Sequence, residues 1–484
     1  MACRLKKLGF DQFMVFENPA LFYSYSFAPN PNWSTIRPSG EELLAYLHQV
    51  CEQHQIADKF QLCAEVIEMA WDAGQNEWEL LIGHIKPGLE NLTKLQKQDM
   101  TKLGGTGAVY SREELVRARI VISATGLLVE PSAWPDNVPG WQEFQGHIVH
   151  SAQWDSAINL RGKDILVVGT GSSAAQIVPE LIKPEVGARS VTQLMRTAPW
   201  VSPYISPTTV QLYEKYGQWI MRHIPLAARL VRMAIFLRLE FDYFALISDN
   251  WYSRRKRPLV EAQLLEHMRQ TAPKEYHEML TPSYGVGCKR RVFDVNWLAA
   301  LHNPAVILTD RRLLAIEPNA VILSAAKRTI SASAQDPGSL STTVPVDVII
   351  MATGYQASSW AHLPPITGRH GKLLADQWKD RGGPQAYLGT AIDGFPNFFM
   401  LFGPNTAVGH SSAILAIENS INYVLKLIKP IIESKADVIE VKKSASTAWA
   451  AEVQEALRGT VLATGGCSSW YTSKDGGWNP TIYP

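Results

Sequence analysis

The chain has 484 residues, enough for about two to four domains of ordinary size, each with its own core. Its 46 lysines and arginines nearly balance its 45 aspartates and glutamates, so the formal net charge is +1. No overall electrostatic field therefore favours a polyanion, and we expect no nucleic-acid partner. A hydrophobic content of 46% with 19% charged residues excludes a mainly disordered chain.

The cysteines are scattered, odd in number and form no CxxC pair. Such a set is typical of reduced thiols in an intracellular compartment rather than of a disulfide framework. The N-terminus has no apolar segment of signal-peptide length, so we expect a cytoplasmic protein. The five thiols are those of Cys3, Cys51, Cys63, Cys288 and Cys467.

Short runs of Val, Ile and Leu that end in glycine-bearing turns predict buried strands of a doubly wound sheet. Two of the turns read Ala-Thr-Gly and flank a helix-rich block and a β-rich stretch, which predicts one nucleotide-binding domain inserted into another. The runs occupy residues 119–124, 164–168 and 346–352, the helix-rich block residues 203–301, and the β-rich stretch residues 306–343.

The most apolar long stretch of the chain runs from Trp219 to Ile247. It contains six charged residues, too many for a lipid-spanning helix, and we expect it to pack as a helical hairpin or cap. Its arginine-rich face leaves a second interpretation open, an amphipathic helix on a membrane surface. We prefer the packing role and expect no membrane contact.

A glycine-rich turn directly follows the apolar run 164–168 and directly precedes a helical pattern. It fits the dinucleotide-binding pattern G-x-G-x-x-G/A, in which the first glycine allows the tight turn and the second lets the backbone approach a pyrophosphate. The free N–H groups at the start of the helix would then face the phosphates. The residues are Gly169, Thr170, Gly171, Ser172, Ser173, Ala174 and Ala175.

The strand predicted next, residues 190–195, ends in Arg196 and Thr197. An acidic residue at this point would hold the ribose 2′-hydroxyl of NAD, whereas an arginine suits a 2′-phosphate. The sequence therefore predicts NADPH rather than NADH.

A second pattern stands just before this domain and places an imidazole and an indole at a domain crossover. It resembles the fingerprint of Baeyer–Villiger monooxygenases, F-x-G-x-x-x-H-x-x-x-W-P/D, within the flavin-containing monooxygenase superfamily. In the sister group that oxygenates nitrogen or sulfur the tryptophan is usually tyrosine, so the resemblance favours ketone oxidation. The matching residues are Phe144, Gly146, His150, Trp154 and Asp155.

The resemblance covers nearly the whole chain, is closest to fungal secondary-metabolism members, and implies FAD and NADPH as cofactors. It implies that Arg290 supplies a guanidinium that stabilises the negative charge developing during oxygen transfer. Segments 395–406 and 409–412 resemble the strand, turn and helix that close over the flavin ring. The resemblance places Glu17, Tyr23, Val66 and Asn405 at the FAD site.

The implied fold is α/β, with two Rossmann-like dinucleotide-binding domains and the NADP domain inserted into the FAD domain. We expect the first part of the FAD domain in residues 1–155 and its second part in residues 346–484. The NADP domain is expected in residues 156–345, with a helical insert at about 205–280.

The chain departs from the family near its N-terminus. Family members open with a strand and a G-x-G-x-x-G turn for the FAD pyrophosphate, and no such turn precedes Glu17. A G-G-T-W segment and a Y-P-G-x-x-C-D segment are also missing between Glu17 and Tyr23. We therefore expect weak FAD binding, and we prefer an incorrectly predicted gene over a degenerate paralogue or a repurposed scaffold.

The expected reaction inserts oxygen from O₂ beside the carbonyl of a small apolar ketone. An aromatic polyketide intermediate, as in aflatoxin- or sterigmatocystin-like mycotoxin pathways, is the expected substrate. Two alternatives stay open: an N- or S-oxygenating flavin monooxygenase, and a catalytically degenerate NADP-binding paralogue. A metal enzyme has little support, because His147 and His150 lack further ligands at usable spacing.

Overall fold

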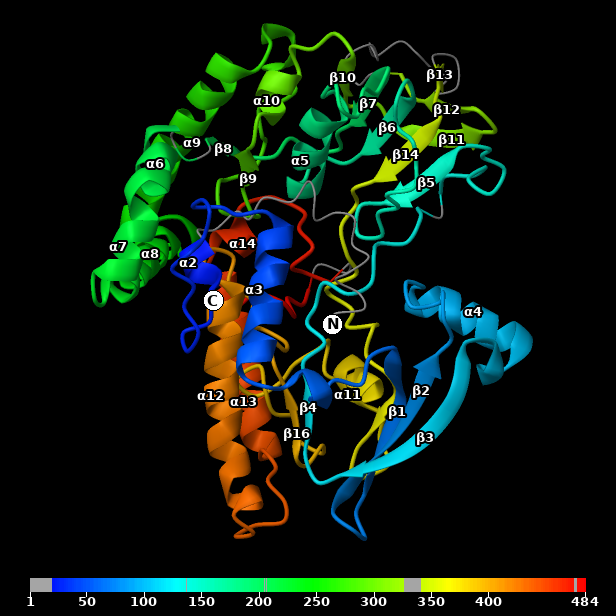
Figure 1. The fold of residues 1–484 in the computed structure, drawn as a ribbon, viewed down its shortest axis with the longest axis vertical. Coiled ribbons are helices and arrows are strands. Elements are labelled where there is room, and N and C mark those ends of the chain that lie inside the picture. The colour runs from blue at the N-terminus through cyan, green and yellow to red at the C-terminus, as the bar shows by residue number, and fades with distance from the viewer. Residues whose placement is uncertain (1–19, 136, 204, 206, 326–340, 474–476) are drawn as a thin grey trace.

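The computed structural model describes residues 20–135, 137–203, 205, 207–325, 341–473 and 477–484 (Figure 1). Glu17 and the strand predicted around it lie outside the described residues. The described chain divides into an upper part built on a parallel sheet, a lower part of mixed sheets and long helices, and a helical arm along one side (Figure 1).

The upper part is built on a five-stranded sheet of order β10-β7-β6-β14-β5 in which every neighbouring pair is parallel. Its central strands are buried on both faces, as expected for a parallel sheet. Their bounds are β5 (His147–His150), β6 (Asp164–Val168), β7 (Ser190–Leu194), β10 (Val306–Thr309) and β14 (Val348–Met351).

Helices pack on one face of this sheet, and a second sheet packs on the other. Ile165 and Val167 point to a core shared with α5 (Ser172–Leu181) and with α9 (Trp251–Thr271) and α10 (Trp297–Ala300). Leu166 points the other way, toward a three-stranded antiparallel sheet. That sheet comprises β11 (Leu313–Glu317), β12 (Ala320–Leu323) and β13 (Thr342–Pro345).

The limits of 156–345 predicted for the NADP domain fall inside this parallel sheet. Strand β14 pairs with β6 on one side and β5 on the other, with Met351 opposite both Val168 and His150. Both β5 and β14 were expected in the FAD domain, at residues 1–155 and 346–484. The chain enters and leaves the inserted domain through these strands, so the strand pairing extends beyond the predicted limits of 156–345.

The lower part contains a curved mixed sheet and a short parallel pair. Trp78 is fully buried in the core between them, and its Nε1–H donates to Pro396 O at 2.8 Å. The strands are β1 (Ala64–Asp72), β2 (Glu77–Ile85), β3 (Tyr110–Ala118), β15 (Ile366–Thr367), and the pair β4 (Val121–Ser123) and β16 (Phe398–Met400).

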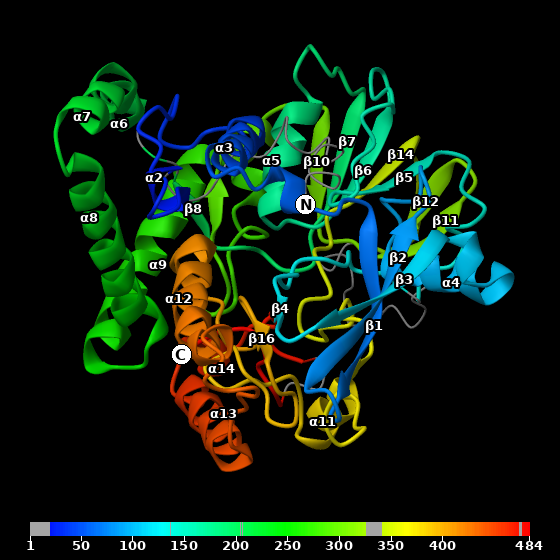
Figure 2. The ribbon, with the colours of Figure 1, turned by 60° about the horizontal axis from the view of Figure 1, so that its bottom comes forward.

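Helices fill the space beside these strands (Figures 1 and 2). The Ser39 side chain caps the start of α3 by accepting a hydrogen bond from Glu42 N–H, which satisfies one of the free amides there. The helices are α2 (Ala20–Tyr23), α3 (Gly40–Gln53), α4 (Lys94–Gly104), α11 (Leu374–Asp380), α12 (Ala413–Ile432), α13 (Lys443–Arg458) and α14 (Val461–Thr464).

The helical arm corresponds to the insert predicted at about 205–280. It forms an edge of the molecule in both views (Figures 1 and 2). No helix among the described residues is both long and apolar enough to cross a lipid bilayer. With α9, the arm comprises α6 (Pro207–Leu212), α7 (Gln218–His223), α8 (Ala227–Asp242) and the π-helical turns η4 (Tyr213–Gly217) and η5 (Tyr243–Ile247).

A disulfide joins Cys288 and Cys467, whose Cα atoms lie 6.0 Å apart although 179 residues separate them in sequence. The expectation of reduced thiols is therefore wrong for this pair. Cys51 and Cys63 are free, and Cys3 lies outside the described residues. No spacing pattern among the cysteines indicates a pair so far apart. The cytoplasmic location stays a prediction, and the pattern of cysteines no longer supports it.

The disulfide can be checked chemically. If the denatured chain is alkylated without reductant, Cys51 and Cys63 should be modified, whereas Cys288 and Cys467 should react only after reduction. Peptide mass spectrometry with two distinguishable alkylating reagents separates the two classes. If the reagent applied before reduction were found on both Cys288 and Cys467, the disulfide would be contradicted.

Candidate active site

The glycine-rich turn at the end of β6 has the backbone that a pyrophosphate site requires. Gly169 has φ +122°, and a Cβ there would lie 2.6 Å from Ala352 O, so only glycine fits. A Cβ on Gly171 would meet no atom within 4 Å, so this side of the turn is open. Gly171 also begins α5, whose first N–H groups face outward from the helix end. The turn therefore fits the phosphates of NADP.

The remaining residues of the turn hold its shape. Thr170 Oγ1 lies 3.5 Å from Thr197 O, and the Gln193 side chain donates to Gly169 O at 2.9 Å. Ala174 and Ala175 are fully buried, so α5 packs closely on the sheet at the turn. Ser172 and Ser173 form the first turn of α5.

Two cations lie near one another at the far side of this site. Arg196 follows β7 and lines a cavity of about 750 Å³ together with Thr197. Burial lowers the pKa of Lys289, and the positive charge of Arg196 lowers it further. Because an anion between two such cations would relieve their repulsion, this pair suits a 2′-phosphate. Lys289 was not among the residues expected at this site, although it stands directly before Arg290.

The fingerprint residues mainly fix the crossover into the inserted domain. A Cβ on Gly146 would lie 2.2 Å from Asp347 O, so β5 approaches β14 too closely for any side chain. Phe144 packs on the core on one face of the sheet and Trp154 on the core of the other. Asp155 is exposed, and its Oδ1 accepts from Ala157 N–H at 2.9 Å.

His150 stands at the carboxyl end of β5, beside the end of β14. Its Nδ1 accepts from Ala152 N–H at 3.0 Å, so the proton of the neutral ring is on Nε2, which lies 3.3 Å from Thr353 Oγ1. Burial lowers the pKa of His150 to about 4, although a hydrogen bond with the Gly354 backbone opposes this shift. His150 is therefore a neutral donor at the edge where sheets of this kind bind ligands.

This burial makes the stability of the fold depend on pH. In the unfolded chain the pKa of His150 is about 6.5, so between pH 6.5 and 4 the unfolded state binds more protons than the folded state. Stability should be complete above pH 6.5 and fall as the pH drops toward 4. Urea midpoints at pH 7 and pH 5 should differ less for His150→Gln than for the wild type. An equal loss in both would contradict the burial.

Arg290 lines a small cavity between the two domains and the helical arm. The cavity measures about 80 Å³, and its apolar walls include Leu246 and Ile247 of η5. Arg291 lines it too; burial lowers the pKa of Arg291, while the carboxylate of Asp242 opposes that shift. Arg290 itself is exposed, so its guanidinium lies at the side of the cavity open to solvent.

His410 lies on the opposite wall of the same cavity. Its Nε2 is 3.2 Å from Glu240 Oε1, and its ring centroid is 4.8 Å from that of Tyr243. Within the described part of the chain, His410 Nδ1 and Ser411 Oγ are buried and form no hydrogen bond. Both belong to the segment expected to close over the flavin, so that segment retains polar atoms suited to the edge of the ring.

The predicted FAD residues do not all come together. Tyr23 ends α2, whereas half-buried Val66 lies in β1, and both views place these elements well apart (Figures 1 and 2). The Asn405 amide donates to Asn479 O at 2.7 Å and to Ile482 O at 2.9 Å. Asn405 thus fixes the C-terminal segment, a role that its sequence position did not reveal.

Comparison with known proteins agrees with this architecture. Residues 90–269 match the family model of flavin-binding monooxygenase-like proteins. A Baeyer–Villiger monooxygenase from Pseudomonas aeruginosa is 31% identical over an alignment that covers all of this chain and 85% of that protein. The chain belongs to the flavin-binding monooxygenase family. The FAD-binding monooxygenase ktnD from Aspergillus niger is 30% identical to this monooxygenase, over 95% of the chain and 69% of that protein.

Solved structures show the same fold. An oxidised steroid monooxygenase bound to NADP matches with a TM-score of 0.72 and 23% identity, over 97% of this monooxygenase and 86% of that chain. Cyclohexanone monooxygenase from Rhodococcus sp. Phi1, bound to NADP⁺, matches with a TM-score of 0.72 and 20% identity, over 99% and 87%. The predicted α/β fold with FAD and NADP domains is confirmed.

The enzyme class and the cofactors predicted from the sequence are confirmed as well. The protein is an NADPH-dependent flavin monooxygenase, and FAD and NADP are its cofactors. The glycine-rich turn and the Arg196–Lys289 pair fit NADP, and the 409–412 segment fits the flavin ring.

Proposed function

We propose that this monooxygenase carries out Baeyer–Villiger oxidation of an apolar ketone. One atom of O₂ enters between the carbonyl carbon and its neighbour to give an ester or lactone, and the other leaves as water while NADPH and a proton are consumed. The relatives from Pseudomonas aeruginosa and Aspergillus niger support an oxygenation of this kind.

One observation carries the proposal: Lys289, whose pKa the charge of Arg196 lowers, lines the same interdomain cavity as Arg290. When bound, FAD would supply the chemistry that activates O₂. A residue shared in this way keeps the nicotinamide cofactor and the place of oxygen transfer in one fixed arrangement.

The residues around the cavity have complementary roles in the proposed reaction. Arg290 stays charged at every working pH and stabilises the negative charge that develops on oxygen as the carbonyl is attacked. Leu246 and Ile247 form a buried apolar wall of the same cavity. His150, neutral and fixed by Ala152, donates a hydrogen bond from Nε2 at the sheet edge.

The substrate class that we propose is an aromatic polyketide ketone of fungal secondary metabolism. Two fungal relatives support it, from Aspergillus niger and Aspergillus terreus, at 30% and 27% identity. The apolar cavity walls agree with such a ring system. Because about 80 Å³ is below the roughly 300–1,000 Å³ of ordinary ligand pockets, the walls must move apart to admit it.

Paired substrates test the reaction. With FAD and NADPH, an aromatic ketone should give an ester one oxygen atom heavier, whereas a matched aryl sulfide should give sulfoxide at a much lower rate. Faster conversion of the sulfide would favour the N- or S-oxygenating alternative. NADPH binding without any oxygenated product would favour a degenerate paralogue.

A further inference from the structure

The outer face of α8 and η5 carries a continuous stripe of exposed apolar side chains. Successive members are three or four residues apart, which places them on one face of a helix. Each is between 47% and 68% exposed, and the arm from 212 to 259 holds 13 of the 32 large apolar side chains that are exposed in the described chain. This α8 stripe consists of Leu226, Leu230, Met233, Leu237, Phe241 and Phe244.

The opposite face of α8 is already occupied. The Arg232 guanidinium donates to Leu21 O at 2.7 Å and to Ser24 O at 2.6 Å. Leu239, on the same face as Arg232, lines the active-site cavity. The α8 stripe is therefore the face that the described residues leave uncovered. Six apolar side chains in one row form a larger patch than the single exposed apolar residues found on most protein surfaces.

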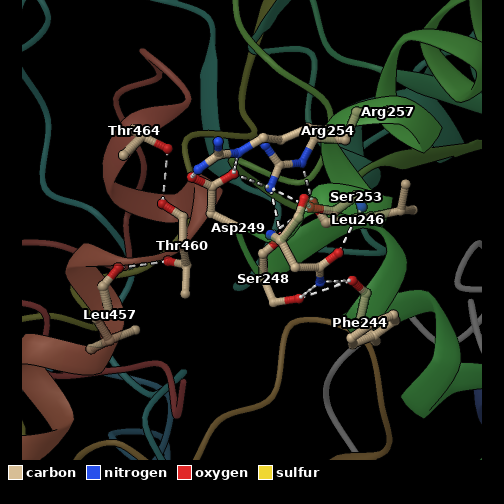
Figure 3. Close-up of polar contacts among 11 residues, drawn as sticks. Phe244, Leu246, Ser248, Asp249, Ser253, Arg254, Arg257, Leu457, Thr460 and Thr464 are labelled. Carbon is tan, nitrogen blue, oxygen red and sulfur yellow. Dashed lines mark hydrogen bonds and ion pairs between the residues drawn. The ribbon is translucent and has the colours of Figure 1, made fainter.

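The arm is held firmly at its base (Figure 3). The Arg257 guanidinium donates to Leu246 O at 2.9 Å and to Ser248 O at 2.7 Å, and Arg254 pairs with Asp249. Asp249 N–H donates to Gly459 O at 3.2 Å, which ties this turn to the C-terminal part of the chain. The stripe is thus displayed on a fixed scaffold.

The arm is strongly basic although the whole chain is nearly neutral. Residues 207–259 contain nine lysines and arginines and four aspartates and glutamates, an excess of five positive charges against +1 for the chain. Arg229 and Arg238 of α8 are exposed, and the Arg238 side chain is 73% exposed although it pairs with Asp242 at 3.5 Å. Apolar residues flanked by arginines are the pattern of a helix that lies in a lipid interface.

We propose that the α8 stripe docks this monooxygenase on an anionic lipid surface. A second copy of the chain fits the stripe less well, because pairing would bring two basic arms together. An anionic surface complements these charges, at about 1 kcal/mol for each lysine or arginine near it. The expectation of no membrane contact rested on net charge and sequence pattern, neither of which shows that this face stays uncovered.

Docking would also bring apolar substrate close to the chemistry. Leu239 and Leu246 line the active-site cavity, while Leu237 and Phe241 belong to the stripe on the outer face of the same helical segment. One helix, about 10 Å across, therefore separates the cavity from the lipid. This part of the inference rests on the proposed oxidation of an apolar ketone.

Vesicle flotation of the full chain tests the docking. The wild type should float with phosphatidylcholine vesicles containing phosphatidylserine, less with pure phosphatidylcholine, and less as salt is raised. Leu230→Glu with Leu237→Glu, and separately Arg229→Glu with Arg238→Glu, should each weaken binding at least about tenfold. Leu103→Glu, a change at a 91% exposed leucine of α4, should leave it unchanged.

Each other outcome is decisive. Wild-type chain that stays unbound, or stripe variants that float as well as the wild type, would overturn the proposal. If the wild type formed a dimer without lipid, and Leu230→Glu with Leu237→Glu made it monomeric, self-association would replace lipid docking as the role of the stripe. NADPH oxidation with a water-soluble ketone should be the same in the stripe variants, and its absence in the wild type would count against the proposed reaction while leaving the docking result intact.

Discussion

Replacing Arg290 with alanine should slow product formation by about a hundred- to a thousandfold, the usual effect of removing one preorganised donor from a site of developing negative charge. Reduction of bound flavin by NADPH should remain largely intact, since the NADP contacts come from the glycine-rich turn, Arg196 and Lys289. Rapid-mixing spectroscopy follows flavin reduction separately from ester formation. The prediction concerns oxygen transfer alone.

Two further variants make this experiment specific. Arg290→Lys keeps the charge but loses the planar guanidinium, so it should recover only part of the rate. Arg312→Ala removes an exposed arginine at the start of β11 and should behave like the wild type. If Arg290→Ala lost flavin reduction as completely as oxygenation, its assigned role would be wrong.

Removing Arg196 should convert the protein from an NADPH enzyme into one with little preference. Hydrogen bonds to charged groups contribute about 1.5–3 kcal/mol, so Arg196→Ala should raise the KM for NADPH by about ten- to a hundredfold. The KM for NADH should change less than about threefold, because NADH has no 2′-phosphate. Initial rates with both cofactors measure the ratio.

Lys289→Ala should shift the same ratio in the same direction, since Lys289 lies close enough to Arg196 for the arginine charge to lower its pKa. Lys289→Arg keeps a cation there and should retain most of the preference. If either alanine variant raised the KM for NADPH and for NADH by the same factor, these cations would not recognise the 2′-phosphate.

Much of the upper domain could be predicted because its determinants are local. The run 164–168 is β6 itself, and the turn after it needs glycine for reasons visible in the sequence pattern. The helical arm also lies where its composition indicated. By contrast, β5 and β14 pair with each other although about 200 residues separate them in sequence. No local sequence pattern specifies such a pairing.

The active-site cavity shows the same limit. Arg290 was expected there from resemblance, but Asp242 and His410 reach it from elements that meet only after folding. The Cys288–Cys467 disulfide and the buried amide of Asn405 likewise depend on where the C-terminal segment returns. Exposure of the α8 stripe could not be predicted either, because an apolar helix face looks the same in sequence whether or not it is covered.

The most direct test of the central claim is an absorption spectrum of the purified chain titrated with FAD and then treated with NADPH in the absence of oxygen. The measurement requires no choice of substrate. A flavin band that stays with the protein and is bleached by NADPH much faster than by NADH is the expected result. A protein that retains no flavin at saturating FAD, or whose bound flavin NADPH does not reduce, would contradict the assignment of this chain as an NADPH-dependent flavin monooxygenase.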